Sequence, residues 1–353
     1  MSSPTSRKGS QPHQLRTAAE PRQNRLYNVR LSHIEQVNPS VRLLQLTIPP
    51  EVQDEAEGPE LDQTTPPQPL TFLPGQWLDV HIPTISHAGG FSITSTPADA
   101  QILPSLEPPT AIPIEETDIP PIDPHGRPPY VELAVRHAPS NPASAWLWRP
   151  ADEILGTELS IRVGGSFVWP PSSSGVVELT RIRTVVFVAG GVGINPLISM
   201  LSHLNNGDDE ATALQHPHLN IRFLYSTKLP RGEGEANGTS LDQVLFLSRL
   251  RQIIASQSQF HRLQISLDLF ITDLDPGTEL GSLLGGSSED LTLHARRINR
   301  GDLEKVVSGP DGRVRPEETV CYVCGPPEMT DEVVESLEGF LGKGERVFYE
   351  KWW

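Results

Sequence analysis

The chain has few cysteines and no long hydrophobic run. Its two cysteines, Cys321 and Cys324, are too few for the disulfide framework of a small secreted fold or for an iron–sulfur cluster. If both lie on one strand, their odd spacing directs them to opposite faces, which disfavours a bond between them. No stretch approaches the ~20 apolar residues that cross a bilayer, and the start lacks an apolar secretory signal. We therefore expect an intracellular protein with no membrane insertion.

Positive charge is also scarce. Lysine and arginine total 28 against 44 aspartate and glutamate, which gives a net charge of −16. Such a chain repels the phosphates of nucleic acids and the anionic headgroups of membranes. Neither nucleic acid nor a membrane surface is therefore expected as a partner. With 353 residues, of which 37% are hydrophobic, the chain can bury two separate cores.

The first residues are basic and rich in serine. Residues 1–19 contain no acidic residue, a composition that weakly suits a mitochondrial presequence. Pro4 and Pro12 would interrupt an amphipathic helix there. We expect residues 1–24 to form a disordered tail or a weak presequence, and the protein to be mitochondrial or cytoplasmic.

Residues 25–175 read as short strands in which apolar and polar residues alternate. Six such strands, punctuated by proline and glycine, predict a closed antiparallel β-barrel with one short helix near residues 143–148. The predicted strands cover residues 26–37, 41–49, 76–83, 90–97, 130–137 and 157–167. Insertions at 51–70 and 98–129 interrupt the series, and their proline-rich, acidic composition predicts disordered surface loops.

After Arg181 the pattern changes to that of an α/β domain over residues 181–353. The run TVVFVAG is continuously apolar, as expected for a parallel strand covered on both faces. Helical spacing of leucines follows it, and strands and helices then alternate. This order predicts a doubly wound parallel sheet with right-handed crossovers. Further strands are predicted at residues 221–227, 263–272 and 319–325, and further helices at 241–256 and 330–341.

A glycine-rich turn joins the first strand of this domain to its helix. Glycines let the backbone bend sharply and approach a ligand, while free amides at a helix N-terminus attract a pyrophosphate. We expect Asn195 to cap the helix, Pro196 to lie in its first turn, and Gly193 to leave room for the pyrophosphate. The alternative is an ordinary tight turn, but its place in a doubly wound domain favours dinucleotide binding. The predicted site comprises Gly190, Gly191, Val192, Gly193, Ile194, Asn195 and Pro196.

A second signal lies at the end of a later strand, in CYVCGPPEMTDEV. Ligands of doubly wound sheets sit outside the carboxyl ends of the strands, so Cys324, Gly325 and Pro326 are expected to face the same crevice, before a helix capped near Thr330. The CxxC spacing also occurs in zinc sites. Since no second pair of cysteines or histidines has ligand spacing, we predict no metal site.

The order GGFS, GGVGINP, CGPP and a terminal EKWW resembles the ferredoxin reductase-type flavoprotein family, from Leu26 to Trp353 without the insertions. The resemblance implies that the barrel holds FAD and that the α/β domain brings NAD(P)H to it. Carried onto this sequence, it places Ser92 near the flavin N5 and Cys324 beside the nicotinamide. It implies catalytic roles for Ser92, Cys324 and Glu350, and flavin contacts for Phe91, Trp352 and Trp353.

The flavin motif departs from the family pattern. Where the family usually has Arg-x-Tyr-Ser, this chain has Gly89, Gly90, Phe91 and Ser92, so a bidentate partner for the flavin phosphates is missing. A second family motif has Pro142 where glycine is common. A bound FAD, a bound FMN and an empty flavin site all remain open.

Two functions are compatible with these patterns. The first is an NAD(P)H-dependent flavoprotein oxidoreductase that passes a hydride from the nicotinamide to the flavin, and electrons on to an acceptor that the sequence does not identify, with a separate redox protein as one candidate. The second is an NAD(H)-binding module without turnover. After the second strand of the α/β domain, Lys228 and Arg231 suit the extra phosphate of NADP(H), whereas Glu233 and Glu235 oppose it. The resemblance favours NAD(H), with NADP(H) as the alternative.

Overall fold

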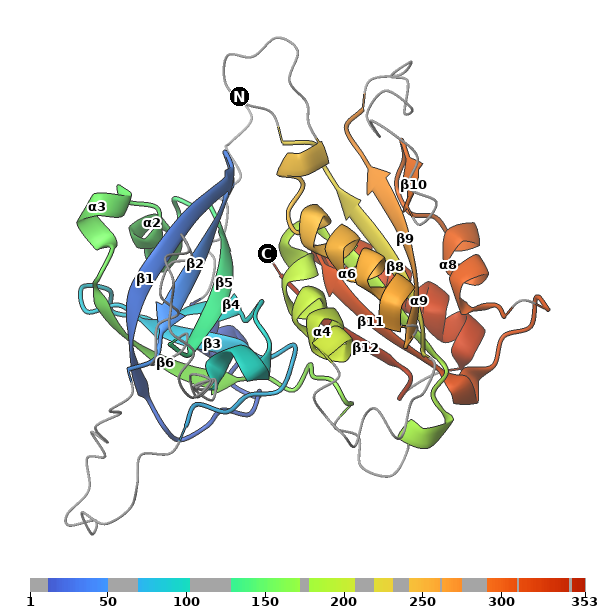
Figure 1. Ribbon diagram of the computed structural model, residues 1–353, viewed down its shortest axis with the longest axis horizontal. Helices are drawn as coiled ribbons and strands as arrows, with labels where there is room; N and C mark the ends of the chain where they lie inside the picture. The colour runs from blue at the N-terminus through green and yellow to red at the C-terminus, as the bar shows by residue number, and fades with distance from the viewer. Residues whose placement is uncertain are drawn as a thin grey trace, which may run out of the picture.

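The computed structural model describes residues 12–49, 69–101, 128–171, 178–206, 219–230, 241–260, 262–274, 291–309, 311–342 and 345–352. The chain folds into a β-barrel and an α/β domain that lie side by side (Figure 1). Each domain is built on a six-stranded sheet. The predicted order of the two domains is therefore confirmed.

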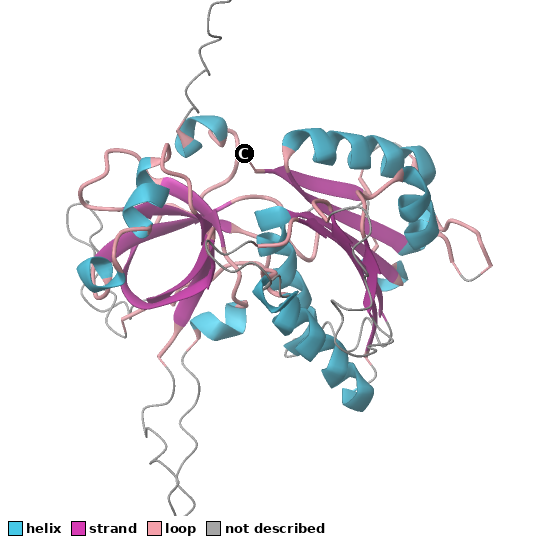
Figure 2. Cartoon of the chain, turned by 90° about the horizontal axis from the view of Figure 1, so that it is seen from above, coloured by secondary structure: helices cyan, strands magenta, loops and turns pink. Residues whose placement is uncertain are grey.

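The first domain is a six-stranded antiparallel barrel with strand order β4-β3-β6-β1-β2-β5. A bridge between Ile93 and Leu133 joins the two outer strands, β4 and β5. Figure 2 shows the strands of this domain curving into a ring. Apolar side chains alternate into its core, as in the buried Tyr27, Val29 and Leu31. All six predicted strands are present: β1 (Tyr27–Asn38), β2 (Val41–Thr47), β3 (Trp77–His81), β4 (Gly89–Ser92), β5 (Tyr130–Arg136) and β6 (Glu158–Gly164).

Short helices complete the barrel: η1 (Pro97–Ala100), α2 (Pro142–Leu147) and α3 (Ala151–Ile154). The predicted helix near residues 143–148 corresponds to α2. The interiors of the two insertions, residues 51–68 and 102–127, lie outside the described residues. At their edges, Leu70 is buried in the barrel core and η1 has a capping box, so folded structure reaches further into both insertions than the sequence predicted.

The second domain is a parallel six-stranded sheet with strand order β10-β9-β8-β7-β11-β12. This confirms the doubly wound α/β architecture. Two edge strands were not predicted, because each is short and mixes polar with apolar residues. The strands are β7 (Thr184–Gly190), β8 (Leu219–Thr227), β9 (Leu263–Ile271), β10 (Leu291–His294), β11 (Thr319–Gly325) and β12 (Val347–Lys351).

Helices cover both faces of this sheet, with α4 (Ile194–Asn206) and α6 (Leu247–Phe260) on the face toward the barrel (Figure 1). On the other face lie α8 (Arg300–Val307) and α9 (Pro327–Leu341). Cys321 packs on the second face and Cys324 on the first, as their spacing predicted, and both are free thiols. None of the helices in the described part of the chain has the length and apolar composition of a membrane span.

Two helix starts differ from the sequence predictions. Residues 241–256 do not form one helix, because Phe246 adopts a φ of 60°, which separates the short η4 (Leu241–Gln243) from α6. The last helix begins at Pro327 rather than near Thr330, since proline is well suited to the first helical position.

The segment before the first strand also differs from expectation. Residues 12–24, predicted to belong to a tail, instead pack on the outer face of the barrel and begin with a short helix, α1 (His13–Arg16). The carboxylate of Asp79, fully buried on β3, accepts hydrogen bonds from Arg22 and from Arg162. A buried carboxylate requires such partners, which holds the segment in place. Residues 1–11 lie outside the described part of the chain.

Polar side chains join the two domains. Arg249 on α6 donates to both carboxylate oxygens of Glu132 on β5, at 2.9 and 3.1 Å. The hydroxyl of Ser199 donates to the Ser95 carbonyl at 2.7 Å, and the amide of Asn195 donates to the Ala134 carbonyl at 2.9 Å. These bonds fix α4 and α6 against the barrel.

The pair between Arg249 and Glu132 gives a stability prediction. Arg249→Met would leave the buried Glu132 carboxylate without its charged partner, so we expect the free energy of unfolding to fall by about 2 kcal/mol. The control Arg30→Met removes an exposed pair with Glu158 and should cost less than about 0.5 kcal/mol. Urea unfolding measures both, and equal effects would contradict the importance of the interface.

Candidate functional site

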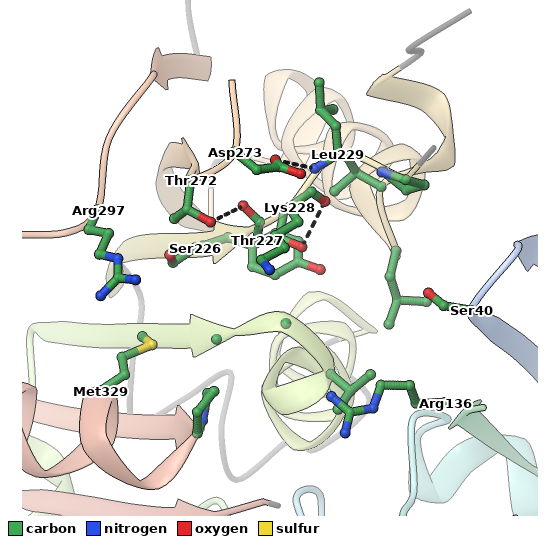
Figure 3. A pocket seen from close by; sticks show the side chains of 18 of the residues that line it. Ser40, Arg136, Ser226, Thr227, Lys228, Leu229, Thr272, Asp273, Arg297 and Met329 are labelled. Carbon is green, nitrogen blue, oxygen red and sulfur yellow. Dashed lines mark hydrogen bonds between the residues drawn. The ribbon is translucent and has the colours of Figure 1, made fainter. Parts of the chain in front are cut away.

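A cavity of about 670 Å³ opens between the domains, at the carboxyl ends of β7, β8 and β9 (Figure 3). In open α/β sheets this end of the strands is where ligands bind, and the volume suits a nucleotide-sized molecule. The barrel contributes the β1–β2 turn and Arg136. The α/β domain contributes the glycine turn, the segments that follow β8 and β9, Arg297 and Ile298, and the start of α9.

The glycines of the predicted turn have different roles. Gly191 begins η3 (Gly191–Gly193) with a φ of 55°, and a Cβ atom there would meet nothing within 4 Å, so this position faces the open cavity. A Cβ at Gly193 would instead lie 2.2 Å from the Cys324 carbonyl oxygen. The expectation that Gly193 makes room for a pyrophosphate is corrected. Gly193 allows the turn to pack against β11, and Gly191 is the glycine that a ligand would approach.

The second half of the turn contacts the barrel and does not line the cavity. Helix α4 starts at Ile194, so Asn195 lies inside the first turn and is not the predicted N-cap, whereas Pro196 lies in that turn as predicted. Asn195 is 6% exposed, and its amide bonds to the barrel. Ile194 and Pro196 are likewise buried. Of the predicted turn, only Gly190, Gly191 and Val192 line the cavity.

The loop after β8 forms another wall of the cavity. The hydroxyl of Thr272 donates to the Thr227 carbonyl at 3.3 Å, and the Leu229 amide donates to the Asp273 carboxylate at 2.9 Å (Figure 3). These bonds hold Lys228 at the cavity, where its side chain is exposed. Arg231, Glu233 and Glu235, considered in the choice between NAD(H) and NADP(H), lie outside the described residues.

Two further cationic side chains line the cavity, and the sequence analysis identified neither of them. Arg136 reaches it from the end of β5 in the barrel, and Arg297 from the segment after β10. No local signal marks either residue, because the first lies in another domain and the second follows an unpredicted strand. Together with Lys228 they give an anionic ligand three cationic groups to approach.

Contrary to the sequence prediction, Cys324 does not face the cavity. Its side chain is fully buried in the core between the sheet and α4, and burial together with the charge of Glu350 raises the pKa of the thiol well above its usual range. The alternation of side chains along β11 accounts for this placement. Gly325 is buried next to it, and Pro326 is the member of this motif that lines the cavity.

The residues that the resemblance assigns to the flavin lie outside this cavity. Ser92 ends β4 with 3% exposure, and Phe91 packs against the barrel core. Glu350 pairs with Cys324 between β12 and β11, and the Trp352 indole donates to its carboxylate at 3.0 Å. Burial, with the nearby charge of Glu20, raises the pKa of Glu350 to about 8. Trp353 lies outside the described residues.

The space between β4 and Trp352, where the resemblance places the flavin ring, holds His13 of the same chain. The His13 ring is parallel to the Trp352 indole, with centroids 6.1 Å apart, and meets Trp77 edge-on at 4.5 Å. A Cβ at Gly90 would lie 2.1 Å from the Nδ1 atom of His13. The imidazole therefore lies directly against the Gly90 backbone.

The groups that a flavin phosphate would need are also engaged. The Asn141 side chain accepts hydrogen bonds from the amides of Ala143 and Ser144, which are the first free amides of α2. The Ser144 hydroxyl donates to the Arg136 carbonyl and accepts from the Ala138 amide. As described, the barrel residues do not fit a bound flavin. Nor do three His, Cys, Asp or Glu side chains gather as a metal ion requires anywhere in the described residues.

The raised pKa of Glu350 predicts a pH dependence of stability. The pKa of Glu350 is about 8 in the folded protein and 4.5 ordinarily. Its contribution to the free energy of unfolding is therefore fully present below pH 4.5 and is lost as the pH rises through 8. We expect Glu350→Gln, which imitates the protonated carboxyl, to reduce the fall in the urea midpoint between pH 5 and pH 9. The exposed control Glu335→Gln should leave that fall unchanged, and equal behaviour of the two variants would contradict the assignment.

Comparison with known proteins places this geometry in context. No known family model matches the sequence. Oxidoreductase NAD-binding domain-containing protein 1 of Danio rerio is 27% identical over 342 residues, which cover 97% of each chain. Solved structures that share the fold include a cytochrome P450 reductase of Amycolatopsis, and a ferredoxin NADP⁺ reductase of Neisseria gonorrhoeae with bound FAD and NADP.

The Amycolatopsis structure has a TM-score of 0.55 at 15% identity, over 94% of this chain and 70% of its own. The Neisseria structure has a TM-score of 0.54 at 13% identity, over 93% of this chain and 99% of its own. The chain thus resembles an oxidoreductase NAD-binding domain-containing protein along nearly its whole length, and has the two-domain fold of the ferredoxin reductase-type flavoproteins.

Proposed function

We propose that this protein is an NAD(P)H-dependent oxidoreductase that binds NAD(H) in the crevice between its domains. The observation that carries the proposal is the cavity of about 670 Å³, which the glycine turn, the end of β8 and the start of α9 enclose. The resemblance to NAD-binding oxidoreductases along the chain supports the same kind of activity.

The cavity offers each part of the dinucleotide a suitable wall. The pyrophosphate would lie over Gly191, where the backbone is open and the N-terminal end of α4 contributes its positive dipole. The adenosine ribose would lie beside Lys228, which also suits the extra phosphate of NADP(H) as the alternative nucleotide. The nicotinamide would lie toward Pro326 at the end of β11. Such binding would orient the nicotinamide C4 atom toward the acceptor that receives its hydride, and this orientation would be the protein's main contribution to hydride transfer.

Of the three proposed catalytic residues, Glu350 of β12 and Cys324 lie at the end of β11, and Ser92 lies on β4 of the barrel. Glu350 is protonated at neutral pH and accepts a hydrogen bond from Trp352, so it can hold a proton next to this strand end. Cys324 is a positioning residue, because its carbonyl contacts the glycine turn while its thiol is buried. Ser92 remains the proposed polar contact on the barrel side.

A second candidate is an NAD(H)-binding protein without turnover. It is favoured by the imidazole of His13, which fills the space between β4 and Trp352. An assay of NADH oxidation with an artificial electron acceptor separates the candidates. Sustained oxidation by the purified chain supports the oxidoreductase, and saturable NADH binding without oxidation supports the second candidate.

The open position at Gly191 allows a matched test of the binding site. Aspartate and asparagine tolerate the left-handed backbone better than other residues, and they differ here mainly in charge. We expect Gly191→Asp to weaken NADH binding about tenfold or more, because its carboxylate would face the pyrophosphate. Gly191→Asn should weaken it much less. Fluorescence titration measures both affinities, and equal losses would argue against a pyrophosphate at this turn.

A further inference from the structure

We propose that residues 12–25 are a built-in occupant of the flavin position: while seated on the barrel they exclude a flavin ring and leave NAD(H) as the nucleotide that the protein binds. The part of this inference that concerns NAD(H) rests on the proposed function. The exclusion of the flavin rests on contacts of the segment itself.

The first of these contacts is between His13 and Gly90. The imidazole lies between the Gly90 backbone and the Trp352 indole, nearly parallel to the indole at 9°. An aromatic ring in that position occupies part of the volume that a flavin ring would need. Gly90 is needed for this contact, because any side chain there would collide with His13.

The environment of His13 suits a neutral ring. The residue is 6% exposed, and burial lowers the pKa of its imidazole to about 4, against the opposing effect of Asp79. Arg16 and Arg22 also lower this pKa. A neutral, buried heterocycle that stacks on Trp352 and meets Trp77 edge-on makes the kind of contacts that a flavin ring makes with aromatic side chains.

An ionic cluster anchors the segment behind His13. The Asp79 carboxylate accepts from Arg22 Nε at 2.9 Å and from Arg162 at 2.9 Å, and its other oxygen lies 3.6 Å from His13 Nε2. Arg22 also donates to the Thr17 carbonyl at 2.6 Å, which closes the segment on itself. The guanidinium group of Arg22 lies over the Trp77 ring, 4.8 Å from its centroid.

Backbone bonds seat the rest of the segment along β6. The Gln23 amide donates to the Val163 carbonyl, and the Gly165 amide donates to the Pro21 carbonyl, both at 2.9 Å. The Ser166 hydroxyl donates to the Glu20 carboxylate at 2.6 Å. The segment therefore has specific partners at both ends. A tail that merely covered the surface would need none of them.

A release variant tests the inference. His13→Asp places a carboxylate against the buried carboxylate of Asp79, and this repulsion should unseat the segment. The matched control is His33→Asp on the exposed side of β1. Trypsin cleavage after Arg22 reports release. Quenching of riboflavin fluorescence reports access of a flavin ring, since riboflavin needs no phosphate site.

We expect rapid cleavage and about tenfold tighter riboflavin binding in His13→Asp than in the wild type and the control. Riboflavin binding by the wild type at the affinity of the released variant would overturn the inference. Release without any gain in riboflavin binding would also overturn it.

A disulfide staple keeps the inference testable if the release variant fails to fold. In the double variant His13→Cys with Gly90→Cys, the new side chains would face each other across the contact. We expect the bond to form on mild oxidation and to leave NADH affinity unchanged, while riboflavin is excluded until the bond is reduced. Failure to form the bond, or equal riboflavin binding before and after reduction, would contradict the seated segment. If the wild-type protein did not bind NADH, the proposed function would be contradicted instead.

Discussion

The interface between the two domains is the constraint on which the site depends. The crevice exists only because α4 and α6 are held against the barrel, by the bidentate pair of Arg249 with Glu132 and by the bond from Asn195 to Ala134. Helix α4 serves both purposes, since its first residues carry the glycine turn on one side and the docking contacts on the other. A change in this interface would therefore change the width of the cavity, even though its residues contact no ligand.

The α/β domain and the barrel differ in how accessible their candidate cofactor positions are. On the side of the α/β domain, the cavity is open and lined by a glycine with a left-handed backbone and by exposed cations. On the side of the barrel, His13 lies against Gly90 and the Asn141 side chain caps the amides of α2. The departures of the sequence from the flavin motif fall on the barrel side. The proposals therefore assign an open nucleotide site to the α/β domain, and a flavin position occupied by residues 12–25 to the barrel.

Much of this structure could be predicted from the sequence. Alternation of apolar residues identified all six barrel strands, and the apolar run before Gly190 identified the strand and turn of the candidate nucleotide site. The edge strands β10 and β12 were not predicted, because a short strand at the edge of a sheet lacks the continuous apolar pattern of a central strand. The packing of residues 12–24 on the barrel was not predicted for another reason. The partner of Arg22 is Asp79, 57 residues away, and no local pattern connects them. Likewise, the neighbour of Gly193 lies on β11, so its packing role is visible only in three dimensions.

The most direct test of the account is hydrogen–deuterium exchange of the full chain, measured by mass spectrometry with and without NADH. The account predicts that NADH slows exchange in the glycine turn, in the loop after β8 and at the start of α9, and that residues 13–25 exchange equally slowly in both conditions. An unchanged glycine turn would contradict the proposed nucleotide site. Fast exchange of residues 13–25 in the free protein would contradict the seated segment.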